Sequence, residues 1–133
     1  MKHPNAQVLE QLYSHFAKGD IPGVLALCDD KITFEVKGKS KLAGKFTKAD
    51  VGQKFFARLA ELAGGDYKLE VHDILASDRH AVVLASSVVN KGGPENRQQI
   101  QLRAAHVWRF EGGKPVAWYE YPRDMYAFDQ AWS

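Results

Sequence analysis

The stretch between Gln98 and Tyr121 constrains the fold of this chain more than any other. Apolar and polar residues alternate from Gln98 to Phe110, and Gly112-Gly113 separates this run from a second, largely apolar one that ends at Tyr121. Alternation of period two is the pattern of a β-strand with one buried face, and a glycine pair between two such runs indicates a tight antiparallel hairpin. The chain must therefore contain a sheet whose two faces differ.

The rest of the chain predicts an α+β order in one domain, residues 1–133. Apolar residues at helical spacing indicate a helix that ends at Lys18-Gly19, a short one capped by Asp20, and a third from about Asp50 to Gly64-Gly65. A strand is predicted around 32–36, a Gly/Lys-rich connection at 38–45, long strands at 67–77 and 80–90, and a terminal helix from about Asp124. We expect helices on one face of a curved antiparallel sheet.

The hairpin register decides which residues face the helices. We predict a three-residue turn, Glu111-Gly112-Gly113, which pairs His106 with Trp118 and Ala104 with Glu120. The inner residues would then be His106, Trp108, Val116, Trp118 and Glu120, and the outer ones Val107, Ala117, Tyr119 and Tyr121. A two-residue turn at Gly112-Gly113 would shift the register and move Glu120 to the outer face.

An imidazole and a carboxylate among aromatic side chains indicate a pocket. Over half of the aromatic residues follow Ala105. Burial in apolar surroundings favours proton uptake by a carboxylate, so Glu120 is a candidate general base and His106 a candidate acid or orienting group. The competing interpretations are a rim carboxylate paired with an arginine and a core histidine bonded to a carbonyl. The candidate ligand-binding residues, which could equally be core, are Trp118, Trp108, Phe34, Phe55, Phe56 and Tyr13. His72 is added because His72-Asp73 interrupts an apolar alternation and fits either a bulge or an exposed strand end.

The charge and composition of the chain limit the kinds of partner that we expect. The net charge is +2 with interspersed signs, and the lysines near Lys41 have no stacking aromatics between them, so we expect no nucleic acid partner. The single cysteine, Cys28, allows no disulfide within the chain, and no apolar stretch reaches membrane-spanning length. No histidine spacing matches a metal motif, and no nucleotide-binding motif is found. We expect a cytoplasmic protein with no metal, no cofactor and no membrane contact.

Several segments resemble the SnoaL-like branch of the nuclear transport factor 2-like superfamily. They are Gly19-Asp20, Cys28-Asp29-Asp30, Leu42-Ala43-Gly44, Phe55-Phe56-Ala57-Arg58-Leu59, Val71-His72-Asp73, His106-Val107-Trp108-Arg109-Phe110 and Trp118-Tyr119-Glu120-Tyr121. The resemblance implies a cone-shaped fold, in which three helices of the N-terminal half pack on the concave face of a curved antiparallel or mixed sheet and a short helix ends the chain. It also implies a pocket between sheet and helices, and a homodimer. That homodimer would form through the outer residues Val107, Tyr119 and Tyr121.

Two enzyme patterns within that superfamily can be compared residue by residue. The ketosteroid isomerase pattern places its acidic base at Val36 and its two donors at His106 and near Leu12, and this chain keeps none of those residue types. The SnoaL-type polyketide cyclase pattern places an acidic base where this chain has Glu120, with glutamate for aspartate. The resemblance therefore implies cyclisation or isomerisation of a hydrophobic carbonyl compound without a cofactor. A non-catalytic binding or dimerisation module is the alternative.

Overall fold

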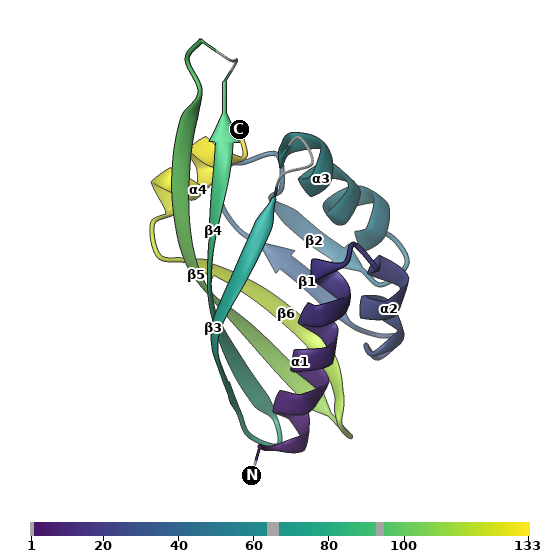
Figure 1. Ribbon diagram of the computed structural model, residues 1–133. Coiled ribbons are helices and arrows are strands. Elements are labelled where there is room, and N and C mark those ends of the chain that lie inside the picture. The colour runs from purple at the N-terminus through teal and green to yellow at the C-terminus, as the bar shows by residue number, and fades with distance from the viewer. Residues whose placement is uncertain (1, 64–66, 93–94) are drawn as a thin grey trace.

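The computed structural model describes residues 2–63, 67–92 and 95–133 and shows helices packed on one face of a six-stranded sheet (Figure 1). The strands are β1 (Thr33–Val36), β2 (Gly44–Thr47), β3 (Lys68–Ala76), β4 (His80–Lys91), β5 (Gln98–Glu111) and β6 (Lys114–Pro122). Their order across the sheet is β2-β1-β6-β5-β4-β3. Among the described strands, only β1 and β6 pair in parallel, so the sheet is mixed and the expected α+β class is confirmed.

Local capping fixes the first two helices, α1 (Pro4–Ala17) and α2 (Ile21–Ala26). Helix α1 ends where Gly19 adopts a φ of 72°, and its amide donates to the carbonyl of Phe16 over 2.9 Å. Asp20 then caps α2, because its Oδ1 accepts a hydrogen bond from the Gly23 amide at 3.0 Å. The predicted helix end at Gly19 and the predicted cap at Asp20 are both confirmed.

The third helical region begins with a π-helical segment, η1 (Gly52–Phe56), and continues as α3 (Ala57–Ala63). Asp50 Oδ1 accepts a hydrogen bond from the Thr47 amide at 2.6 Å, which is one half of a capping box. The π-helical turn changes the angular spacing of the side chains, so that Phe55 and Phe56 both contact the aromatic cluster around Phe34 and Trp118. The predicted stop at Gly64-Gly65 lies outside the described residues.

The hairpin between β5 and β6 differs from the prediction in its pairing. Glu111 pairs with Lys114, so the turn has two residues, and Gly112 and Gly113 have φ angles of 57° and 80°. The three-residue turn and its pairs were therefore wrong: His106 lies opposite Glu120, and Trp108 lies opposite Trp118.

A β-bulge nevertheless keeps Glu120 on the inner face. Phe110 pairs with Pro115 but Arg109 pairs with Ala117, so Val116 is an extra residue in β6. Without it, the two-residue turn would place Glu120 beside outward-facing neighbours, as the period of two requires. Four of the five residues expected on the inner face, His106, Trp108, Trp118 and Glu120, are thus confirmed there, although the mechanism is different. The fifth, Val116, is the extra residue of the bulge.

Two further elements differ from the sequence interpretation or decide between its alternatives. The connection predicted at 38–45 ends in a real strand, β2, whose Phe46 pairs with Phe34 of β1. A bulge lies between Val71 and Asp73 in β3, which leaves His72 as the extra residue, exposed and within 2.7 Å of Ser86 Oγ through its Nε2. Four-residue strands such as β2 give too short an alternation to be recognised against a lysine-rich background.

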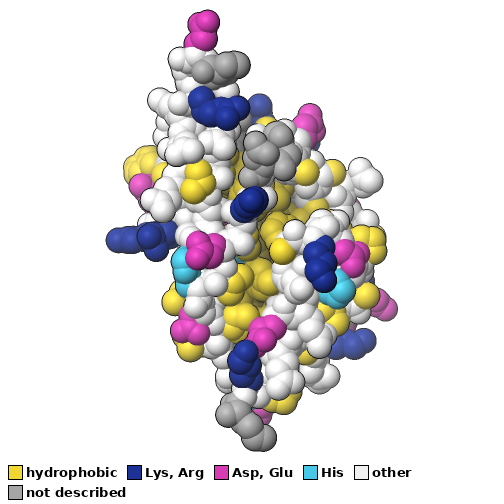
Figure 2. All heavy atoms as spheres, viewed as in Figure 1, with side chains coloured by type: hydrophobic (Ala, Val, Ile, Leu, Met, Phe, Trp, Pro, Cys, Tyr) yellow, Lys and Arg dark blue, Asp and Glu magenta, His cyan; other side chains and the backbone are white. Residues whose placement is uncertain are grey.

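The core fills the space between the sheet and the helices and contains most of the large apolar side chains. Helix α4 (Met125–Ala131) closes one end of it, capped by Asp124, and buries Phe128 together with the following Trp132. Figure 2 shows hydrophobic side chains gathered in the middle of one face, between β3 and the helices α1 and α3. This is the mouth of the pocket described next.

Candidate active site

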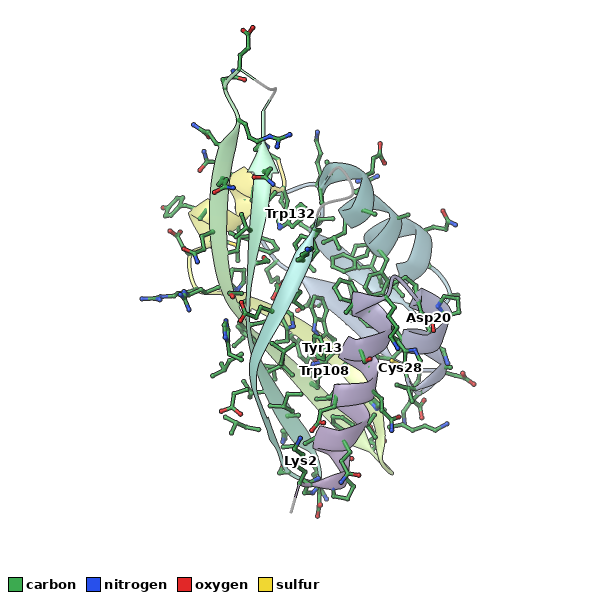
Figure 3. All side chains as sticks on the ribbon, viewed as in Figure 1. Lys2, Tyr13, Asp20, Cys28, Trp108 and Trp132 are labelled. Carbon is green, nitrogen blue, oxygen red and sulfur yellow. The ribbon has the colours of Figure 1, made fainter. Side chains whose placement is uncertain are left out.

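Four side chains from three elements form a continuous polar chain in the otherwise apolar interior. Tyr13 extends from α1, His106 and Trp108 from β5, and Glu120 from β6. The Trp108 indole donates to the Tyr13 hydroxyl at 3.2 Å, and that hydroxyl lies 2.6 Å from His106 Nδ1. His106 Nε2 lies 2.9 Å from Glu120 Oε2. Figure 3 shows Tyr13 and Trp108 close together between α1 and the sheet.

The hydrogen-bond donors of these four side chains all point in one direction, from Trp108 towards Glu120. An indole N–H can only donate, so the Tyr13 oxygen accepts from Trp108 and the Tyr13 proton is available to His106 Nδ1. A neutral His106 then carries its own proton on Nε2, the nitrogen that faces Glu120. The hydrogen-bond network thus assigns the tautomer.

Burial keeps the Tyr13 hydroxyl protonated, which suits its role as a donor. Burial raises the pKa of Tyr13 far above its usual value, and the negative charge of Glu120 raises it further. Hydrogen bonds from the indoles of Trp108 and Trp118 oppose the rise without cancelling it.

One carboxylate oxygen of Glu120, Oε2, has no hydrogen-bond partner among the described residues. This oxygen is buried and close enough to His106 for electrostatic attraction, yet the angles do not make a hydrogen bond, and no other described group supplies one. Buried carboxylate oxygens in folded proteins are nearly always hydrogen-bonded. An unsatisfied one that lines a pocket is available to a ligand.

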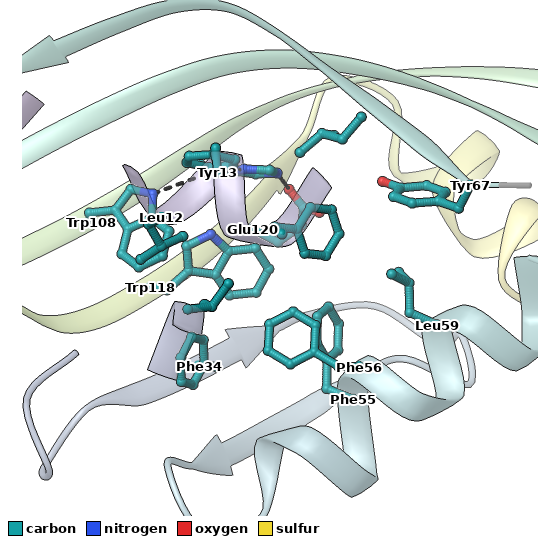
Figure 4. Close-up of a pocket in the computed structure, with 14 residues that line it drawn as sticks. Leu12, Tyr13, Phe34, Phe55, Phe56, Leu59, Tyr67, Trp108, Trp118 and Glu120 are labelled. Carbon is teal, nitrogen blue, oxygen red and sulfur yellow. Dashed lines mark hydrogen bonds and ion pairs between the residues drawn. The ribbon is translucent and has the colours of Figure 1, made fainter. Parts of the chain in front are cut away.

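Aromatic and aliphatic side chains enclose this carboxylate in a pocket whose open space, with its mouth included, is about 550 Å³ (Figure 4). The Trp118 ring lies 5.3 Å from the His106 ring and 5.7 Å from that of Phe55, centroid to centroid. The full lining is Leu12, Tyr13, Phe16, Val24, Phe34, Phe55, Phe56, Leu59, Tyr67, Leu69, His106, Trp108, Trp118 and Glu120. Only one of these side chains, Glu120, is an acid, and none is a lysine or arginine.

A second, smaller cavity continues beyond Glu120 and His106 towards α4. Phe128, Trp132 and Ser87 line it, and Tyr67 lines both cavities. Burial raises the pKa of Tyr67 to about 12, opposed by a hydrogen bond from Ser87 and reinforced by the charge of Glu120. The Tyr67 hydroxyl therefore lies in the electrostatic field of the same carboxylate.

The structure brings nearly all of the candidate residues together. The eight that line the pocket are Glu120, His106, Trp118, Trp108, Phe34, Phe55, Phe56 and Tyr13. His72 is different: its bulge directs it to the exposed side of β3, and it does not line this pocket.

Sequence reasoning missed two polar features of the site. Tyr13 was treated as a wall residue, and its hydrogen bonds to residues of β5 could not be foreseen from the periodicity of α1. Tyr67 was taken as the first residue of a strand, although it lies just before β3 and its hydroxyl faces the pocket. Neither residue carries a local sequence signal, because partners on other elements define both roles.

Comparison with known families identifies the fold at the sequence level. A family model for the SnoaL-like domain matches residues 9–118. The chain belongs to the SnoaL-like family. The matched range begins within α1 and ends at Trp118, two residues before Glu120. A search of curated protein sequences finds no match.

Solved structures show the same fold over the whole chain. Bal32a, from a soil-derived mobile gene cassette, is 23% identical with a TM-score of 0.86, and the match covers 98% of this chain and 97% of Bal32a. TerC, co-crystallised with polyporic acid, is 21% identical with a TM-score of 0.81, and the match covers 97% of this chain and 98% of TerC. An epoxide hydrolase of the LEH-like type from M. tuberculosis is 17% identical with a TM-score of 0.67, and the match covers 97% of this chain and 89% of the hydrolase. At these identities the likeness concerns the fold alone.

Two searches bear on other kinds of site. Among the residues that the structure describes, no group of three or more His, Cys, Asp and Glu side chains is arranged to hold a metal ion. In the same residues, no helix has the length and apolar character needed to span a membrane.

Proposed function

We propose that this SnoaL-like protein is a cofactor-independent enzyme that moves a proton on a neutral, hydrophobic carbonyl compound, as in a cyclisation or an isomerisation. Glu120 is the general base, and His106, whose Nε2 faces it, orients it. The observation that carries this proposal is the buried, unsatisfied Oε2 of Glu120 at the wall of an apolar pocket. A carboxylate oxygen without a partner at the wall of a pocket is placed to accept a proton from a bound ligand.

The proposed reaction begins with the transfer of one proton. Glu120 Oε2 takes a proton from the carbon next to the carbonyl, and the C–H electron pair moves towards the carbonyl oxygen to form an enolate. His106 keeps its Nε2 proton beside the carboxylate throughout, since Tyr13 holds the other ring nitrogen. Return of the proton to another carbon completes an isomerisation. In an aldol-type cyclisation the enolate carbon attacks a second carbonyl, and the alkoxide that forms takes the proton back from Glu120.

The charge of the pocket restricts the substrate. Among the residues that the structure describes, the lining of the main pocket holds one carboxylate and no lysine or arginine, so these residues offer no partner to a buried substrate carboxylate or phosphate. Aromatic walls formed by residues such as Phe34, Phe56 and Trp118 favour a flat or cyclic apolar compound. The co-crystallisation of TerC with polyporic acid supports a small organic ligand for this fold.

The alternative is a binding module that holds an apolar ligand without turnover. It uses the same walls and makes Glu120 a hydrogen-bond acceptor rather than a base. The two functions differ in one observable, which is whether a carbon-bound hydrogen of the ligand exchanges.

Hydrogen–deuterium exchange tests the proposal without knowledge of the natural product. The protein is incubated in deuterated buffer with a panel of hydrophobic ketones, including β-tetralone, and proton NMR follows the loss of the hydrogens next to each carbonyl. We expect exchange above the buffer rate for at least one ketone that also raises the melting temperature. Ketones that stabilise the protein but exchange only at the buffer rate would favour the binding module.

A further inference from the structure

We propose that Tyr67 is a catalytic residue whose hydroxyl donates a hydrogen bond to the carbonyl oxygen of the ligand, on the side of the pocket opposite Glu120. This inference rests on the proposed function and assigns the partner of the substrate oxygen. Tyr67 borders both the main pocket and the cavity behind it. Figure 4 shows its hydroxyl at the end of the ring that points across the pocket towards Glu120.

Most of the polar protons in the pocket already face another residue of the site. The Tyr13 proton is engaged by His106, and the Trp108 N–H is engaged by Tyr13. The Trp118 N–H is also directed to Tyr13, and the remaining proton on His106 faces Glu120. Among the described residues, Tyr67 carries the other hydroxyl of the pocket lining. The pocket therefore presents a ligand with a hydroxyl donor, Tyr67, and a carboxylate acceptor, Glu120 Oε2.

Ser87 is buried on the inner face of β4 and lines the smaller of the two cavities that Tyr67 borders. Its side chain acts to lower the pKa of Tyr67, but the larger effect of burial raises it. The Tyr67 hydroxyl therefore keeps its proton, which it can donate to a ligand.

Ring contacts hold Tyr67 in place for this role. Its ring lies 5.5 Å from that of Trp132 and 6.4 Å from that of Phe16, and the second contact is edge-on. These partners come from opposite ends of the chain and restrict the ring from two sides. A donor whose position is fixed before the ligand arrives needs no reorganisation as charge develops.

The pairing accounts for the movement of charge in the reaction. As Glu120 removes the proton from carbon, negative charge accumulates on the carbonyl oxygen, and the Tyr67 hydroxyl is the group placed to stabilise it. The Tyr67 proton stays on its own oxygen, because burial and the Glu120 charge raise the pKa of that hydroxyl to about 12. Each step therefore conserves protons and electrons between the ligand and Glu120.

The first test compares the binding of two flat probes, β-naphthol and naphthalene, to the wild type and to Tyr67→Phe. β-Naphthol has the shape of the enol of β-tetralone and carries an oxygen, whereas naphthalene has the ring system alone. We expect Tyr67→Phe to weaken β-naphthol binding by about fivefold or more, as loss of one hydrogen bond implies, and to leave naphthalene binding unchanged. Tyr126→Phe, on an exposed ring of α4, is the matched control and should bind both probes as the wild type does.

Unchanged naphthalene binding also shows that the variant is folded. Equal β-naphthol affinities of the wild type and Tyr67→Phe would overturn the proposal. So would a wild type that binds β-naphthol no more tightly than naphthalene. If Tyr67→Phe weakens the binding of both probes equally, the hydroxyl contributes no specific hydrogen bond and the proposal again fails.

A second test separates this proposal from the proposed function. In the β-tetralone exchange assay, Tyr67→Phe should lower kcat by about 100-fold with little change in KM, because the donor acts on charge that develops in the transition state. Exchange that is normal in Tyr67→Phe but lost in Glu120→Gln would overturn the role of Tyr67 and keep that of Glu120. A lack of exchange in every protein, with the β-naphthol preference intact in the wild type and lost in Tyr67→Phe, would remove the enzyme and keep Tyr67 as a ligand donor.

Discussion

The Tyr13 hydroxyl lies 2.6 Å from His106 Nδ1, and the two rings are nearly parallel, at an interplanar angle of 8°. This contact links the first helix to the middle of the sheet across 93 positions of sequence. It also fixes which nitrogen of His106 faces Glu120, so a residue of α1 controls the environment of the proposed base.

Tyr13→Phe should destabilise the protein. The substitution leaves His106 Nδ1 and the Trp108 N–H without their partner in a buried setting, which costs about 1–3 kcal/mol. Urea denaturation followed by tryptophan fluorescence measures the free energy of unfolding. Tyr126→Phe, whose ring is 91% exposed, is the control and should change it little. Equal stability of Tyr13→Phe and wild type would contradict the hydrogen-bond chain.

The turn between β5 and β6 should discriminate between side chains at position 112. Gly112 has a φ of 57° and open space where a Cβ would lie, so the backbone alone opposes substitution. Gly112→Asn should be nearly neutral, because asparagine adopts this conformation readily. Gly112→Val should cost about 1–2 kcal/mol, because a β-branched side chain does not. Thermal unfolding of the two variants checks the difference, and equal melting temperatures would argue against the two-residue turn.

Asp20 should stabilise the fold in a pH-dependent way. The Gly23 amide hydrogen bond, aided by His15, holds the pKa of Asp20 below its usual value, although partial desolvation opposes this. A lowered folded-state pKa stabilises the protein above the unfolded pKa, and this stabilisation is lost as pH falls through the folded value. Asp20→Asn retains a capping side chain without the charge. The wild type should therefore be more stable than Asp20→Asn at neutral pH, and the gap should close in strong acid. A gap that is independent of pH would contradict the prediction.

The outer face of the sheet keeps the sequence prediction of a homodimer open to test. Leu84, Val88 and Tyr121 are large apolar or aromatic side chains that remain 41%, 41% and 57% exposed. Val107 and Tyr119 lie on the same face, because they pair with each other across the hairpin beside Tyr121. A second copy of the chain would cover such a patch. Sedimentation equilibrium should report a dimer that Tyr121→Glu weakens and that Tyr126→Glu does not. A wild type that is monomeric at all concentrations would contradict the prediction.

The sequence predicts much of the fold because its signals are local. Alternation in β5, the glycine at position 19 and the capping aspartates depend on neighbours along the chain, and these elements form as expected. The strand β2 is missed because four residues give too little alternation.

The hairpin between β5 and β6 contains a feature that sequence patterns do not predict. The face of Glu120 depends on the sum of two irregularities, a two-residue turn and a bulge at Val116. Each one alone would reverse the face, and together they restore it. A bulge reflects packing against other elements, so the residues of β6 by themselves do not indicate it.

Local sequence patterns likewise predict some residues of the candidate site and not others. His106, Trp118 and Glu120 could be grouped from strand periodicity, since they belong to one hairpin. The hydroxyls of Tyr13 and Tyr67 could not, because each acquires its role from partners on other elements. Their positions require the packed structure.

The most direct test of the account is the rate at which Glu120→Gln exchanges the hydrogens of β-tetralone when the ketone saturates the pocket. Glutamine keeps the size and polarity of the side chain but cannot take a proton. Glu111→Gln is the matched control, because Glu111 lies at the exposed end of β5, where it pairs with Lys31. We expect kcat to fall by about 100-fold or more in Glu120→Gln, with KM nearly unchanged, and to stay at the wild-type value in Glu111→Gln. Equal kcat values in the wild type and Glu120→Gln would show that Glu120 is not the base.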